Sequence, residues 1–236
     1  MLNSNIDKYF KFQKYENFIT KILKPLNLGL LKNSQSTSFF LYKYKDYEEY
    51  RDIQIHFNKE KIYEVWADKQ VLNAVAARIK KENFLVGGGL CHGSRNGFEQ
   101  NHLAEVLGVE VIGTDISETA LNFPNTVQWD FHDVKKEWIG KFNFIYTNSL
   151  DQSWQPETAL KVWMTQIGIG GLIFVEHTNF HGPQSSNKMD PFGVTPQYFP
   201  YLVADWLGHS VSLEIIKETK SNYGYEVWLF VLKKLS

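Results

Sequence analysis

The chain has 236 residues, which is enough for one well-packed α/β domain with an extension but short for two full domains. Its 25 basic and 26 acidic residues give a formal net charge of -1, without a basic face or tail. Nucleic acid is therefore disfavoured as the main partner, because binding to phosphates needs a basic patch. The hydrophobic fraction of 43% excludes wholesale disorder.

Cysteine content and the N-terminal sequence bear on the compartment. Cys91 is the single cysteine, which excludes an internal disulfide and a cysteine-rich zinc site and is typical of a reducing compartment. Residues 1–24 interrupt their apolar positions with charged ones, so no signal peptide and no membrane span are expected there. We expect a cytoplasmic protein without a membrane partner.

Residues 1–82 are charged and aromatic and are predicted to form a mostly helical extension or lid. The apolar spacing within 68–81 predicts one helix, whereas 42–66 has no clear periodicity. Two interpretations stay open: a lid that closes over a ligand, or an extension packed beside the sheet. The residues that a lid would place against a ligand are Gln54, Lys61 and Trp66.

Residues 83–236 alternate short apolar runs with helical patterns, which is typical of parallel βαβ units. The predicted strands are 84–92, 110–114, 126–129, 142–147 and 171–177. The helices between them are predicted to begin near Gly97, Ser117, Asp133 and Pro156. After a long loop, 178–195, come a helix at 196–207 and two runs, 210–217 and 225–232, that predict an antiparallel hairpin.

A glycine-containing turn, 93–97, joins the first predicted strand to an amphipathic helix. Glycine lets the backbone bend tightly beside a ligand, and helix N-terminal NH groups favour a carboxylate or a phosphate. Asp115 ends the second strand, at about the spacing at which an acid binds ribose hydroxyls in nucleotide-binding folds. A plain tight turn and a surface or capping carboxylate are the alternatives, and the joint spacing favours a nucleotide-like ligand.

The spacing of the glycines separates two classes of cofactor. A dinucleotide fingerprint, G-x-G-x-x-G, is absent from the sequence. Gly93, Arg95, Gly97 and Glu99 instead form G-x-R-x-G-x-E, which resembles the cofactor turn of a subset of class I (Rossmann-like) methyltransferases that use S-adenosylmethionine (SAM). The resemblance covers roughly the last two thirds of the chain and extends loosely to small bacterial enzymes that modify sugars and polysaccharides.

The resemblance implies a fold and a cofactor. The fold is a three-layer αβα sandwich whose mostly parallel seven-stranded sheet has the order 3-2-1-4-5-7-6, with the seventh strand antiparallel and residues 1–82 outside it. The cofactor is SAM, with Asp115 on the ribose, Asp130 on the adenine amino group and Phe131 stacked on the ring. The implied cofactor-binding residues are Gly93, Ser94, Arg95, Gly97, Glu99, Asp115, Ile116, Asp130, Phe131 and Asn148.

One position departs from the family pattern. The family usually has an acidic residue two positions before the first glycine, where this chain has Cys91. Glu99 or a nearby main-chain carbonyl is therefore expected to hold the amino group of the methionine moiety.

Candidate catalytic residues follow the fourth and fifth strands. Methylation of a hydroxyl needs a base, and Asp151, His177 and His181 are expected at the crevice where open α/β sheets bind ligands. Backbone-bonded or exposed histidines are the alternative. A second alternative is a divalent-metal cluster of Asp151, Glu176, His177, His181 and Asp190. The histidines expected to be structural are His56, His92, His102 and His209.

The function predicted from the sequence is methyl transfer from SAM to a small molecule, with a hydroxyl oxygen, such as that of a sugar or sugar nucleotide, as the preferred acceptor and without a metal. The residues that suit such an acceptor are Trp154, Asn179, Phe180, Gln184 and Phe192. Two other classes stay open: a nicotinamide-dependent reductase and a non-catalytic binding protein with the same fold. The glycine spacing and the lack of a Tyr-x-x-x-Lys pair in a core helix weigh against the reductase.

Overall fold

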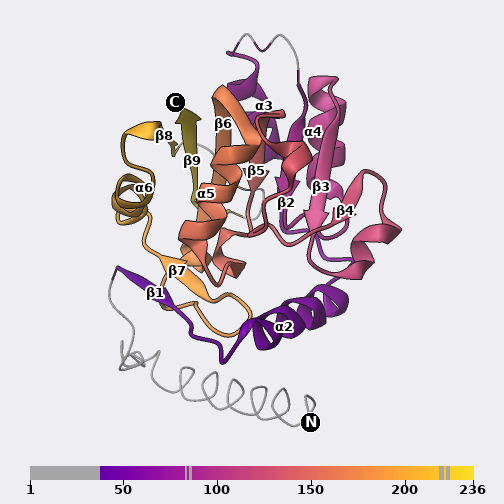
Figure 1. Cartoon of the computed structure of the whole chain (residues 1–236), viewed down its shortest axis with the longest axis vertical. Coiled ribbons are helices and arrows are strands. Elements are labelled where there is room, and N and C mark those ends of the chain that lie inside the picture. The colour runs from indigo at the N-terminus through magenta and orange to yellow at the C-terminus, as the bar shows by residue number, and fades with distance from the viewer. Residues whose placement is uncertain (1–37, 83, 85–86, 218–220, 222–223) are drawn as a thin grey trace. The chain divides into compact units, whose positions relative to one another are not determined.

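A computed structural model describes residues 38–82, 84, 87–217, 221 and 224–236. A mainly parallel sheet flanked by helices forms its centre, as predicted (Figure 1). The strands of this sheet are β2 (Gly89–His92), β3 (Val111–Asp115), β4 (Thr126–Gln128), β5 (Phe142–Thr147), β6 (Ile167–Thr178), β8 (Val211–Ile216) and β9 (Val227–Lys234). The α-helices are α2 (Tyr47–Glu60), α3 (Lys69–Ile79), α4 (Phe98–Leu107), α5 (Pro156–Gln166) and α6 (Phe199–Leu207).

The seven strands lie in the order β4-β3-β2-β5-β6-β9-β8. Numbered within this sheet alone, that is 3-2-1-4-5-7-6. Neighbouring strands pair in parallel along the run β4-β3-β2-β5-β6. Strand β9 runs antiparallel to both β6 and β8. The carboxyl ends of the parallel strands therefore lie along one edge, and α2 lies beside this edge (Figure 1).

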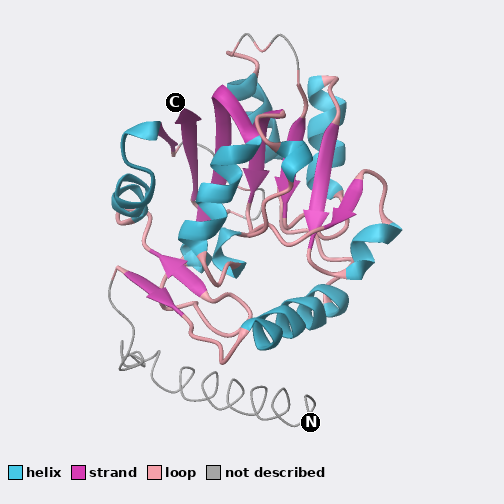
Figure 2. Cartoon of the chain, in the orientation of Figure 1, coloured by secondary structure: helices cyan, strands magenta, loops and turns pink. Residues whose placement is uncertain are grey.

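Each face of the sheet has its own apolar core, because side chains alternate along a strand. In β5, Phe144 and Tyr146 pack with α3 and α4, whereas Ile145 packs with α5 and α6. Trp163 of α5 is fully buried on the second face, and its indole donates to Phe131 O. The helices and the sheet form three layers (Figure 2).

Local sequence signals explain where the helices begin. Asp68 caps α3 by accepting from Gln70 N at 2.7 Å, and Pro156 occupies the first turn of α5. Two predicted helices are wrong in type, because the segments after Ser117 and Asp133 form only short 3-10 turns, η2 (Glu118–Asn122) and η3 (Lys136–Trp138). Pro124 follows the first turn closely, and the residue before a proline is disfavoured in a helical conformation.

Three further elements differ from the prediction. Residues 42–66, which the sequence left unassigned, contain α2. The predicted loop at 178–195 contains a strand, β7 (Phe192–Val194), that pairs antiparallel with β1 (Phe39–Leu41) in a separate two-stranded sheet. Strand β6 begins at Ile167, directly after α5 and four residues before the predicted start at 171.

The part of the extension at residues 1–37 lies outside the described residues. Within the described part of the chain, no helix is long and apolar enough to cross a membrane.

Candidate active site

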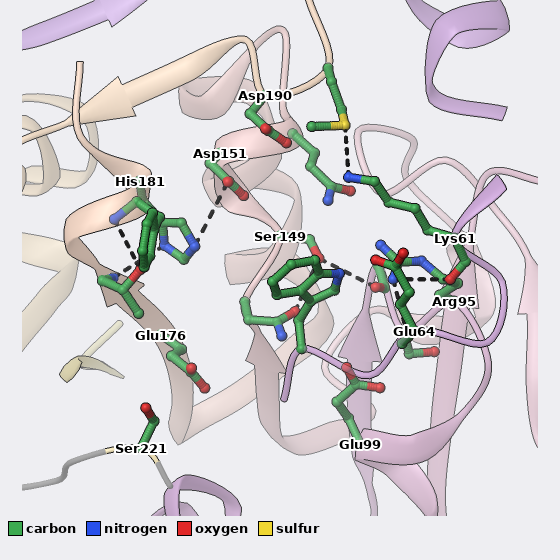
Figure 3. Close-up of a pocket in the computed structure, with 18 of the residues that line it drawn as sticks. Lys61, Glu64, Arg95, Glu99, Ser149, Asp151, Glu176, His181, Asp190 and Ser221 are labelled. Atoms are coloured by element: carbon green, nitrogen blue, oxygen red, sulfur yellow. Dashed lines mark hydrogen bonds and ion pairs between the residues drawn. The ribbon is translucent and has the colours of Figure 1, made fainter. Parts of the chain in front are cut away.

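A cavity of about 440 Å³ opens at the carboxyl edge of the sheet, beside the ends of β2, β5 and β6 (Figure 3). Its lining comes from segments far apart in the sequence. The lining residues are Lys61, Glu64, Trp66, Gly93, Ser94, Arg95, Asn96, Glu99, Asn148, Ser149, Asp151, Gln152, Glu176, Thr178, Phe180, His181, Met189, Asp190, Ser221 and Tyr225.

The glycine turn after β2 forms one wall of the cavity. Gly93, Arg95 and Gly97 have φ values of 71°, 42° and 82°. A Cβ at Gly93 would lie 2.5 Å from Ser149 Cβ, so neighbouring protein already requires glycine there. The turn also contacts Asp115, whose carboxylate accepts from Arg95 N at 3.2 Å and from Ser117 N at 2.9 Å.

The side chain of Arg95 points to the segment after α2. Its Nη1 donates to Glu64 O at 3.2 Å, and Asn96 Nδ2 donates to Ile62 O at 3.0 Å. These bonds fasten residues 61–64 to the glycine turn, which places Lys61 at the cavity. An arginine in the middle of the turn thus joins two parts of the site that are distant in sequence.

Glu99 lies in the first turn of α4 with only 7% of its surface exposed. Its Oε2 has no hydrogen-bond partner among the described residues, and burial raises the pKa of Glu99 to about 7. Glu176, at the end of β6, accepts from Tyr146 OH, and burial raises its pKa to about 7 as well. An unpartnered buried carboxylate is costly, so this part of the cavity is suited to a hydrogen-bond donor or a cation.

Asp151 and His181 lie next to each other in the cavity wall, with Asp151 Oδ2 and His181 Nε2 3.8 Å apart (Figure 3). Burial raises the pKa of Asp151 to about 7 and lowers that of His181 to about 4, so the imidazole is neutral at pH 7. Asp190 lies beside Asp151, and burial together with the charge of Asp151 raises the pKa of Asp190 to about 7.

His177 lies behind this pair. It is 4% exposed, its ring contacts that of His181 at a centroid distance of 5.3 Å, and it lines only a small internal space of about 10 Å³. Burial lowers its pKa to about 3. His177 is therefore separated from the main cavity, and His181 is the histidine that reaches it.

The other predicted cofactor residues line a second, smaller space of about 30 Å³. Asp115, Ile116, Asp130 and Phe131 border it, and it shares Gly93 and Gln152 with the main cavity. It is too small for an adenine ring, because the buried ring of Tyr50 fills this region and stacks on Trp154 at a centroid distance of 5.6 Å.

Helix α2 also forms a hydrogen bond with a polar side chain of this region. Tyr47 OH donates to Asp130 Oδ2 at 2.9 Å. Asp130 Oδ1 accepts from His132 N at 2.9 Å and lies 2.6 Å from His132 Nδ1, while His132 Nε2 lies 2.7 Å from Ser153 Oγ. The acid predicted to bind the adenine amino group is thus engaged by α2 in this structure.

The sequence found part of the site and missed part of it. The predicted residues that line the main cavity are Gly93, Ser94, Arg95, Glu99, Asn148, Asp151 and His181, with Lys61 and Trp66 from the lid and Phe180 from the acceptor group. Gly97, Trp154, Asn179, Gln184 and Phe192 do not line it. Tyr47, Tyr50 and Met189 had no local signal, because contacts between distant segments place them.

The alternative metal cluster does not correspond to any cluster of potential ligands among the described residues. Asp151, Glu176, His177, His181 and Asp190 are all described, and no group of three such side chains within the described ranges is arranged to hold an ion. Among the histidines expected to be structural, His92 is buried between Thr114 Oγ1 and Gln166 Oε1 at 2.9 and 2.8 Å.

No protein-family model and no curated protein matches the sequence. Solved structures match the fold. The 1,6-didemethyltoxoflavin-N1-methyltransferase of Burkholderia thailandensis, solved with 1,6-didemethyltoxoflavin and S-adenosylhomocysteine, matches with a TM-score of 0.63 at 11% identity. That match covers 88% of this chain and 98% of the other.

Two further structures agree. The N-methyltransferase NodS of Bradyrhizobium japonicum WM9, in complex with S-adenosylhomocysteine, has a TM-score of 0.58 at 12% identity, covering 78% of this chain and 100% of the other. The magnesium protoporphyrin IX methyltransferase of Synechocystis PCC 6803, with bound SAM, has a TM-score of 0.54 at 13% identity, covering 81% and 100%. The chain has the class I fold of these SAM-dependent methyltransferases.

Proposed function

We propose that the chain transfers a methyl group from SAM to a small-molecule nucleophile bound in the main cavity. One observation carries this proposal: Glu99 has a buried carboxylate oxygen without a hydrogen-bond partner among the described residues, and Glu99 lines the main cavity. The glycine turn and the Asp151–His181 pair line the same cavity. The neighbours of this fold that were solved with SAM or S-adenosylhomocysteine support the cofactor.

The residues present fit the charged groups of SAM. Glu99 accepts from the amino group of the methionine moiety and replaces the acid that Cys91 cannot supply. Asp115 accepts from the ribose hydroxyls, because each of its oxygens accepts one backbone N–H and a carboxylate has about four acceptor positions, of which Asn58 takes one more. Gly93 and Gln152 border both spaces, so one ligand extends from the main cavity to the smaller space.

When bound, SAM supplies an electrophilic methyl group on its sulfonium. The chain's own residues orient the acceptor and remove its proton. Asp151 and His181 lie at the far end of the cavity from the glycine turn, and either one accepts a proton from a nucleophile placed between them. A hydroxyl of a sugar or another small molecule, which the sequence favours, is one such nucleophile. An amine is another.

Titration calorimetry with S-adenosylhomocysteine, SAM and NAD tests the cofactor. We expect both adenosyl ligands to bind and NAD not to bind. Asp115→Asn replaces one of the two oxygens with an amide NH2, which cannot accept a backbone N–H, and is expected to weaken S-adenosylhomocysteine binding by roughly 10-fold, since a hydrogen bond to a charged group is lost. Asp205→Asn changes an exposed carboxylate of α6 and serves as the control.

Binding of NAD instead would support a reductase. Binding of S-adenosylhomocysteine and SAM without methylation of any acceptor would support the alternative of a non-catalytic binding protein. Unchanged affinity in a folded Asp115→Asn protein would exclude Asp115 from the site.

A further inference from the structure

The main cavity carries an excess of negative charge. Five acidic residues line it, Glu64, Glu99, Asp151, Glu176 and Asp190, against two basic ones, Lys61 and Arg95. Arg95 is engaged with backbone carbonyls, and Lys61 Nζ contacts Met189 Sδ at 3.0 Å. SAM has a net charge of one positive unit, so the cavity stays negative with the proposed cofactor bound when all five carboxyl groups are ionised.

Two of these acidic side chains, Asp151 and Asp190, lie where we propose that the methyl acceptor binds. The charge of Asp151 raises the cost of ionising Asp190, and both side chains are largely buried. Asp151 Oδ1 has no hydrogen-bond partner in the described part of the chain, and the side chain of Asp151 is 11% exposed. His181 is neutral and therefore does not balance their charge. Two neighbouring carboxylates of this kind favour a cation that donates several hydrogen bonds.

We infer that the methyl acceptor is an amine, which enters as an ammonium ion and is held between Asp151 and Asp190. This inference rests on the proposed function and names its substrate class. The charge of Lys61 acts on both carboxylates, and a neutral hydroxyl adds no further positive charge, whereas an ammonium group adds one together with three N–H donors. The acceptor predicted from the sequence, a hydroxyl, fits this charge distribution less well.

Asp151 and Asp190 also account for the proton and the charge in the proposed methyl transfer. The ammonium gives one proton to the Asp151 carboxylate, and its nitrogen lone pair then forms the bond to the methyl carbon. The bond between that carbon and sulfur breaks, and its electron pair stays on sulfur. The products are a methylated ammonium, which Asp190 stabilises, a protonated Asp151 and neutral sulfur, so the total charge is unchanged.

The experiment compares ligand pairs that differ only in an amine and a hydroxyl. The full chain is first titrated with S-adenosylhomocysteine, and failure at this step contradicts the proposed function itself. The saturated protein is then titrated with tyramine against its alcohol counterpart tyrosol, and with glucosamine against glucose, each up to about 10 mM. We expect the amine of at least one pair to bind at least about tenfold more tightly than its partner.

Variants test whether Asp151 and Asp190 cause the preference for amines over alcohols. Asp151→Asn and Asp190→Asn are expected to remove the amine preference while S-adenosylhomocysteine still binds, and Asp205→Asn is expected to keep both. Equal binding within each pair, a preference for the hydroxyl members, or no amine binding to the saturated protein would overturn the inference. A preference that survives in both variants would also overturn it.

Discussion

Glu99 is the residue on which the site depends most directly. It follows Gly97 by two positions, so the first turn of α4 carries it under the glycine turn, and its carboxylate is buried beside Cys91. A carboxylate in this position destabilises the folded chain when it is ionised. Such a cost is typical of a group retained for binding.

Glu99→Gln should therefore make the folded chain more stable and weaken its binding of S-adenosylhomocysteine. The pKa of Glu99 is about 7 in the folded chain and near 4.5 in the unfolded chain, so ionisation destabilises the folded state increasingly from about pH 4.5 and fully above about pH 7. At pH 8 we expect the variant to be more stable by about 1 to 3 kcal/mol, measured by urea unfolding. Calorimetry should show S-adenosylhomocysteine binding weakened by roughly 10-fold or more.

Glu105→Gln, which changes an exposed carboxylate on the same helix, is the control and should alter neither quantity. A Glu99→Gln protein with unchanged affinity for S-adenosylhomocysteine would show that Glu99 does not hold the amino group.

At the scale of the element, α2 covers the side of the site where we propose that the adenosine binds. The helix forms because Asp46 caps it, accepting from Glu49 N at 2.9 Å, and because acidic residues lie in its first turn and Lys59 in its last. It buries Tyr50 against Trp154 and directs Tyr47 to Asp130. Tyr50 fills the space that the adenine ring would need, so we expect α2 to shift when the ligand binds.

Tyr47→Phe removes the hydroxyl that engages Asp130 and leaves the ring in place. We expect S-adenosylhomocysteine to bind roughly 3- to 10-fold more tightly, because a larger fraction of the chain then has α2 displaced. Tyr63→Phe is the matched control, since Tyr63 is 90% exposed. Unchanged or weaker binding to the Tyr47 variant would mean that α2 does not compete with the ligand.

At the scale of the whole molecule, buried ionisable groups set how stability depends on pH. Burial raises the pKa of Asp115 to about 6 and those of Glu99, Asp151, Glu176 and Asp190 to about 7. Burial lowers the pKa values of His92 and His181 to about 4 and that of His177 to about 3. The two sets have opposite effects on stability as the pH changes.

Between about pH 5 and 6 the folded chain holds protons on its five buried carboxyl groups, and the unfolded chain holds them on the three histidines. The folded state binds more protons, so the free energy of unfolding decreases as the pH rises. Above about pH 6.5 the histidines are neutral in both states, and the decrease continues to about pH 7. Melting temperatures from calorimetry should therefore fall by several degrees between about pH 5.5 and 8.

The melting temperature of Asp190→Asn should depend less on pH over this range. A melting temperature that rises steadily from about pH 5.5 to 8 would contradict the assignment of these buried groups.

The sequence by itself determined the alternation of strands and helices, the glycine turn, and the placement of Asp115 at the end of β3. These features depend on neighbours in the chain: apolar periodicity, the cap at Asp68, and glycine at positive φ. Only the tertiary structure decided that Arg95 fastens residues 61–64, that His181 and not His177 reaches the cavity, and that Asp190 lies beside Asp151. Each of these is a contact between segments distant in the chain, which packing fixes and which no local pattern encodes.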